Sequence, residues 1–186
     1  MKTLVLLFTF MTSMVITVSA QSLMDKLFER YSGKEGYTSV SISKEMFDMM
    51  AQVNITTSEK KDQKKLDEMK DFVSKIESLR VISSGSKEGT PADQRASALY
   101  REIMDNMPKN TYKQLMEVKE GEQLVTFYVK RTGAKVAELI VVAREKNETS
   151  LISLAGDIDL NKVSELTKGM NIKGLDKLGN AGEESK

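Results

Sequence analysis

The sequence predicts an α+β fold, a mostly antiparallel sheet with helices packed on it. Two observations lead to this prediction. Residues 112–157 hold four strand-like segments whose connections are so short that neighbouring strands must run antiparallel. Residues 22–107 alternate instead between helical periodicity and two further strand-like runs. We therefore expect a C-terminal four-strand meander, two additional earlier strands, and helices that cover the sheet.

The first half of the domain mixes helices and strands. Each expected helix places apolar residues three and four positions apart, and each expected strand alternates apolar with polar residues or is rich in β-branched ones. The two strands are separated by helices, so they could pair in parallel through right-handed crossovers, and the strand order is left open. The expected elements are a helix at 22–31, a strand at 38–42, a helix from the N-cap Ser43 to 53, a helix at 66–74 and a strand at 76–82. The polar residues 54–65 are either a solvated loop or the frayed start of the helix at 66–74.

The second half begins with the clearest amphipathic helix, which Thr90 and Pro91 start and Pro108 ends. The meander follows, and a last helix begins at Asp159 or Asn161. We expect the four strands at 112–119, 123–131, 135–145 and 149–157.

The strand at 135–145 is apolar on both faces, which predicts a central position covered from both sides. Its first face holds Ala137, Leu139, Val141 and Ala143, and its second holds Val136, Ile140 and Val142. In the preceding strand, Val125, Phe127 and Val129 share one face.

The first twenty residues have the pattern of a secretory signal peptide. A basic residue precedes an apolar run over 4–18, and Val18-Ser19-Ala20 offers small residues at the cleavage position before Gln21. The run is shorter than the ~20 apolar residues that a membrane-spanning helix needs. We therefore expect cleavage between Ala20 and Gln21, and no membrane span after signal removal. An uncleaved membrane anchor is the alternative.

The mature chain predicts one α+β domain over 21–173, followed by a Gly- and charge-rich tail, 174–186, that we expect to be disordered. Removing residues 1–20 takes away one of the 28 Lys and Arg, which leaves 27 cationic against 27 acidic side chains. This balance offers no basic excess for nucleic acid and no polybasic run adequate for anionic lipid. Because Cys is absent, the domain depends on its core alone.

Two segments carry a family resemblance. They read Phe-Glu-Arg-Tyr-Ser-Gly-Lys-Glu-Gly-Tyr-Thr-Ser-Val-Ser-Ile-Ser-Lys-Glu-Met at 28–46 and Leu-Ala-Gly-Asp-Ile-Asp-Leu at 154–160. With the signal peptide and the length, the chain resembles the family catalogued as domain of unknown function 4252, which comprises small exported proteins of Bacteroidota. The resemblance covers nearly all of the mature chain. It implies an envelope location and a shared fold, and it supplies no catalytic residue.

The residue types present limit catalysis. The chain has no His and no Cys, which excludes triads built on imidazole or thiolate and zinc sites that use those ligands. Carboxylates could still serve as general acids and bases. Glu138 is the one acidic residue inside an apolar strand, and we expect it to be partly exposed or in a local ion pair. The sequence therefore predicts no catalytic residue.

Two further motifs suggest metals, and both have a simpler explanation. The start of an EF-hand loop at 157–161 is followed by Lys162 and Lys168 where Gly and Glu are needed, so we expect helix capping by Asp159 or Asn161 instead of calcium binding.

Met46-x-x-Met49-Met50 and Met104-x-x-Met107 have spacings that could offer thioethers to Cu(I). Met46, Met50, Met104 and Met107 fall on apolar helix stripes, so core packing is the favoured interpretation, and we expect no metal and no cofactor. Met49 lies off the stripe centre, and its exposure would favour copper.

These observations favour an exported, non-catalytic binding or regulatory domain of the periplasm or cell envelope that acts through an unidentified envelope protein or surface. The alternative is a carboxylate-based hydrolase acting on envelope glycan. A meander ends in edge strands, and the expected edge is 112–119, where Lys113, Glu117 and Lys119 form a polar face that could meet a partner.

Overall fold

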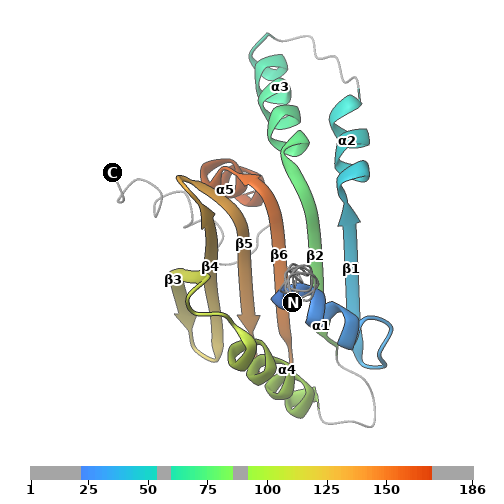
Figure 1. Cartoon of the computed structure of the whole chain (residues 1–186), viewed down its shortest axis with the longest axis vertical. Helices are drawn as coiled ribbons and strands as arrows, with labels where there is room; N and C mark the ends of the chain where they lie inside the picture. The colour runs from blue at the N-terminus through green and yellow to red at the C-terminus, as the bar shows by residue number, and fades with distance from the viewer. Residues whose placement is uncertain (1–21, 54–59, 86–91, 169–186) are drawn as a thin grey trace, which may run out of the picture.

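The computed structural model describes residues 22–53, 60–85 and 92–168. In this part of the chain, one six-stranded antiparallel sheet is surrounded by five helices (Figure 1). The expected signal peptide with its cleavage residues Ala20 and Gln21, and the expected tail 174–186, lie outside the described residues. The elements are α1 (Leu23–Tyr31), β1 (Tyr37–Ser43), α2 (Lys44–Gln52), α3 (Lys60–Ser74), β2 (Ile76–Ser84), α4 (Ala92–Asn106), β3 (Tyr112–Glu120), β4 (Gln123–Thr132), β5 (Lys135–Arg144), β6 (Thr149–Ile158) and α5 (Leu160–Lys168).

The strand order is β1-β2-β6-β5-β4-β3, and every neighbouring pair runs antiparallel. The predicted meander of β3 to β6 is confirmed, and β3 is an edge strand as expected. The two early strands, for which the sequence left parallel pairing open, pair antiparallel. Their connection consists of α2 leaving the sheet and α3 returning to it, side by side, so β2 re-enters beside β1 in the opposite direction (Figure 1).

The sheet is covered on both faces. One buried cluster joins α1 and α4 to the sheet, and the other joins α2, α3 and α5 to the opposite face. Strand β5 contributes to both, with Ile140 in the first cluster and Leu139 in the second, so its predicted central position is confirmed. The predicted shared face of β4 is also confirmed, because its apolar residues Val125, Phe127 and Val129 all lie in the second cluster.

Val136 is a local exception to the predicted alternation. It lies in the second cluster with Leu139 and Val141, although strict alternation places it with Ile140. The pairing registers of β5 shift between Val136 and Glu138 on one side and opposite Lys130/Arg131 on the other. A bulge of this kind moves the residues beyond it to the other face of the strand.

The helix ends differ from the expectations mainly at α3, which begins at Lys60 and not at 66, so residues 60–65 belong to the helix, as the second interpretation of 54–65 has it. Near its start, Gln63 donates a hydrogen bond to Asp67 at 3.1 Å and Lys64 lies 4.0 Å from Glu68. Polar pairs four residues apart can stabilise a helical segment that has no apolar face. Hydrophobic periodicity therefore does not detect this segment. None of the described helices is long and apolar enough to cross a membrane.

Candidate functional site

Helix α2 presents an exposed apolar stripe. Met46, Met49, Met50 and Val53 are 47%, 58%, 51% and 52% exposed. The spacing of the three methionines places them on one side of the helix, and Val53 is its C-cap residue. We call these four residues the α2 stripe. Phe47 lies to one side of this stripe and is 6% exposed, in the cluster shared with α3 and α5. The prediction that Met46 and Met50 pack in the core is therefore wrong.

The position of α2 explains this exposure. Helix α2 follows β1 directly and continues past the end of the sheet, where α3 is its neighbour (Figure 1). A helix in this position has only one side packed against the rest of the domain, and the aromatic ring of Phe47 lies on that side. Helix α4 behaves as predicted, because Met107 is buried and Met104 packs against the core.

The edge of β1 lies next to this helix in the chain and carries no charge. Its sequence is Tyr-Thr-Ser-Val-Ser-Ile-Ser, and Val40 at its centre is 42% exposed. The other edge, β3, exposes Lys113, Glu117 and Lys119. Charged side chains on a sheet edge discourage pairing with other chains, and β3 carries such charges while β1 carries none. Whether the three β3 side chains meet a partner stays a prediction.

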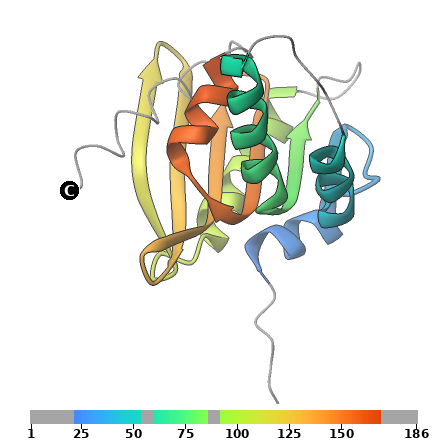
Figure 2. The same cartoon turned by 90° about the horizontal axis from the view of Figure 1, so that it is seen from above.

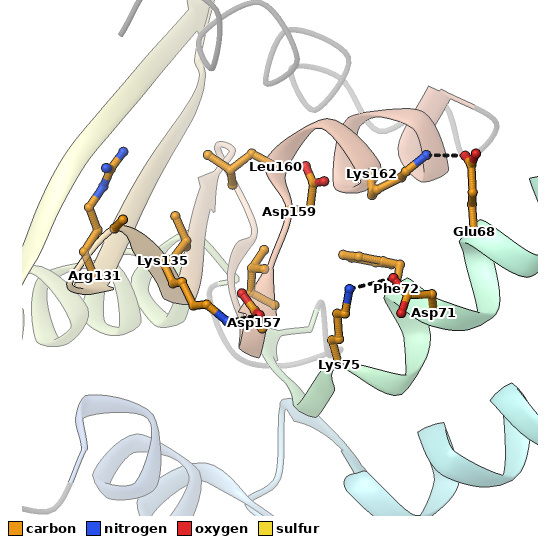
Figure 3. Close-up of a pocket in the computed structure, with 13 residues that line it drawn as sticks. Glu68, Asp71, Phe72, Lys75, Arg131, Lys135, Asp157, Asp159, Leu160 and Lys162 are labelled. Atoms are coloured by element: carbon orange, nitrogen blue, oxygen red, sulfur yellow. Dashed lines mark hydrogen bonds and ion pairs between the residues drawn. The ribbon is translucent and has the colours of Figure 1, made fainter. Parts of the chain in front are cut away.

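A cavity of about 470 Å³ lies between α3, α5 and the β4–β5 turn. Figure 3 shows that most of the labelled side chains around it are charged, and that the apolar Phe72 and Leu160 also line it. Figure 2 shows α3 next to α5. Three of its acidic residues are held by lysines. These pairs are Lys135–Asp157 at 2.5 Å, Lys75–Asp71 at 2.6 Å and Lys162–Glu68 at 2.9 Å.

Hydrogen bonding in this cavity stabilises the ionised forms. The hydrogen bond from Lys162 lowers the pKa of Glu68, and the one to Asp71 raises the pKa of Lys75. A carboxylic acid that donates a proton in catalysis needs a raised pKa, which is the opposite direction.

The EF-hand-like segment has the simpler role. Asp159 accepts a hydrogen bond from the backbone N–H of Asn161 at 2.9 Å, so it caps α5 as predicted. Within the described ranges, no group of three or more acidic side chains is placed to hold a metal ion.

Glu138 is buried, with 7% of its surface exposed. The Tyr112 hydroxyl donates to its Oε2 and the Ser153 hydroxyl to its Oε1, each at 2.7 Å. Burial and then the hydrogen bond to Glu138 raise the pKa of Tyr112, so the phenol stays protonated. The expectation of exposure or a local ion pair is wrong, because two hydroxyl groups satisfy the carboxylate and no cation among the described residues pairs with it. Neither partner could be named from sequence, because Tyr112 is 26 residues away and Ser153 is 15.

Comparison with known proteins identifies a family. A family model described as "Domain of unknown function (DUF4252)" matches residues 31–166, which include every strand of the sheet and the α2 stripe. Neither a search of curated proteins nor a search of solved structures returned a match.

Proposed function

Because the chain belongs to the family of domain of unknown function 4252, we propose that it is an exported, non-catalytic binding or regulatory domain of the bacterial cell envelope. Its contact surface is the α2 stripe with the neighbouring edge of β1, and its partner is an envelope protein. The observation that carries this proposal is the exposure of four apolar side chains, three on one side of α2 and the fourth on its C-cap residue Val53. Contiguous apolar surface on a folded domain marks interaction sites.

The energy available from the stripe supports this use. Fully burying a Met or Val side chain contributes about 1.5–3 kcal/mol, so covering four half-exposed ones would contribute about 3–6 kcal/mol. Association costs about 4–15 kcal/mol in lost translational and rotational freedom, which is as much as this or more. The stripe alone therefore gives weak binding, and a useful affinity needs a second contribution.

The edge of β1 supplies that contribution. An added strand gains backbone hydrogen bonds along an edge, while pockets and flanking side chains give selectivity. Residues 37–43 carry neither charge nor proline that would oppose such pairing. Methionine side chains are flexible and adapt to differently shaped apolar partners. The face of β3 that carries Lys113, Glu117 and Lys119 is the second candidate surface, and it would act through charge pairs.

Export belongs to the same proposal. The pattern at 1–20 supports cleavage between Ala20 and Gln21. The absence of Cys and His is in keeping with a domain whose role is binding. A mature chain beginning at Gln21 would meet its partner in the periplasm or at the envelope.

The test is crosslinking in intact cells followed by affinity purification. The wild-type protein should begin at Gln21 and should capture a reproducible envelope protein. The double variant Met46→Lys/Met50→Lys should lose that capture while it keeps the wild-type melting temperature, because both side chains are already exposed.

The matched control is Lys113→Glu/Lys119→Glu on the opposite edge, which should capture normally. Capture that is lost in this control and kept in the stripe variant would move the contact surface to β3. Turnover of peptidoglycan or another polysaccharide by the pure protein, abolished by a single Asp or Glu substitution, would contradict a binding function and favour the hydrolase.

A further inference from the structure

The α2 stripe contains three thioethers in a triangle, and from this arrangement we propose that Met46, Met49 and Met50 bind one Cu(I) ion. The three residues stand at positions i, i+3 and i+4 of α2. Met46 is therefore a helix-surface neighbour of both Met49 and Met50, with Cβ atoms about 5–6 Å apart, while Met49 and Met50 are adjacent in the sequence and flank it. Each methionine has three rotatable side-chain bonds, so three sulfur atoms can converge on one point above the helix while the backbone stays in place.

The donor set selects the metal. Thioethers are soft ligands, and soft ligands favour Cu(I) over Zn²⁺, Ca²⁺ or Mg²⁺. They are also neutral and carry no proton that the metal must displace, so binding should be nearly independent of pH in the neutral range. The chain contains no Cys and no His to compete for the same ion.

The surroundings of the triangle leave it open to a cation. All three methionines are about half exposed, so an ion delivered from solution can reach the sulfur atoms. The nearest basic residue on the same helix, Lys44, has its ammonium group paired with Asp48 and bonded to the carbonyl of Ser74. Its positive charge is therefore compensated.

The second methionine motif differs in its accessibility. Met104 and Met107 have a spacing of three as well, but Met107 is buried. Met104 packs against the same core, and its sulfur lies 3.9 Å from the Tyr128 hydroxyl. These two thioethers serve packing, so of the two methionine motifs the α2 triangle is the one open to an ion from solution.

This inference goes beyond the proposed function and stands without it, because metal binding needs no partner. The two uses of the stripe can be separated by chemistry. Met49→Leu removes a sulfur and keeps the apolar surface and the helix propensity. Val53→Ala removes apolar surface from the same stripe and leaves all three sulfurs.

The test is an anaerobic titration of the purified mature protein with Cu(I) against a chromogenic Cu(I) chelator. We expect one ion per chain and a melting temperature that rises with Cu(I), because a ligand of the folded state stabilises it. Met49→Leu should weaken binding by at least about tenfold, which corresponds to 1.4 kcal/mol. Val53→Ala should bind Cu(I) as the wild type does.

Failure of the wild type to compete with the chelator would overturn the proposal. Unchanged binding in the triple variant Met46→Leu/Met49→Leu/Met50→Leu would also overturn it, because the ion would then sit elsewhere. Partner capture gives the separate readout. If Val53→Ala loses partner capture and the wild type binds no Cu(I), the proposed function stands and the copper site is overturned. If Val53→Ala captures the partner normally and the wild type binds Cu(I) through the methionines, the copper site stands and the proposed contact surface is overturned.

Discussion

Glu138 connects three strands through one carboxylate. It lies on β5, and its two oxygens accept hydrogen bonds from Tyr112 on β3 and Ser153 on β6. Hydrogen bonds to a charged acceptor are worth more than neutral ones, and a buried hydroxyl that loses its acceptor costs free energy. The cluster is therefore a structural link, and it uses the one acidic residue that the strand pattern singles out.

We predict that Glu138→Ala lowers the free energy of unfolding by about 2–4 kcal/mol, because it leaves the Tyr112 and Ser153 hydroxyls unpaired and opens a small void. Urea denaturation followed by circular dichroism measures the change. Glu117→Ala on the exposed face of β3 is the control, and it should stay within about 0.5 kcal/mol of the wild type. Equal effects at the two positions would mean that the hydroxyl bonds contribute nothing to stability.

Gly156 fixes the contact between β6 and the start of β2. Its φ of 145° is one that residues with a side chain rarely adopt, and a Cβ there would lie 2.2 Å from the carbonyl oxygen of Lys75. The next residue, Asp157, donates its backbone N–H to that same oxygen at 3.0 Å. The glycine in the segment at 154–160 thus allows two backbones to meet where the strand register shifts.

Gly156→Ala should lower the free energy of unfolding by about 2–5 kcal/mol, since backbone strain and the clash with a carbonyl add together. Gly121→Ala is the matched control. Gly121 has a φ of 59° with no atom within 4 Å of an added Cβ, so only about 1–2 kcal/mol of backbone strain is expected. Thermal or urea unfolding of the two variants checks the difference, and a Gly156→Ala protein as stable as Gly121→Ala would show that the backbones can separate without cost.

At the scale of helices and strands, periodicity identified every element but not which side of a helix faces the core. In α2, the pattern predicts one apolar side that holds Met46, Phe47 and Met50, and the structure buries Phe47 while the two methionines face solvent. Periodicity describes a helix alone, and burial depends on what lies beside it. Because α2 extends past the sheet, there is little for a second side to pack against.

At the scale of the whole molecule, short connections predicted the meander, and no local signal predicted where β1 and β2 join it. Their placement depends on the return path of α2 and α3 and on pairing between Ile76–Ser83 and residues 150–156, which are far apart in the sequence. The consequence is a sheet with two unlike edges. The charged edge, β3, could be predicted from Lys113, Glu117 and Lys119, whereas the neutral edge at β1 could be recognised only from the strand order.

The proposed function requires that the α2 stripe is covered by a partner in the cell and open in the isolated protein. Oxidative footprinting of methionine, read by mass spectrometry, tests this most directly. A Cu(I) chelator is present in both samples so that metal cannot protect the sulfur atoms. We predict rapid sulfoxide formation at Met46, Met49 and Met50 in the pure protein and several-fold slower formation in intact cells, while the buried Met107 reacts slowly in both. Equal oxidation rates for the three stripe methionines in cells and in pure protein would contradict the proposal that a partner covers the stripe.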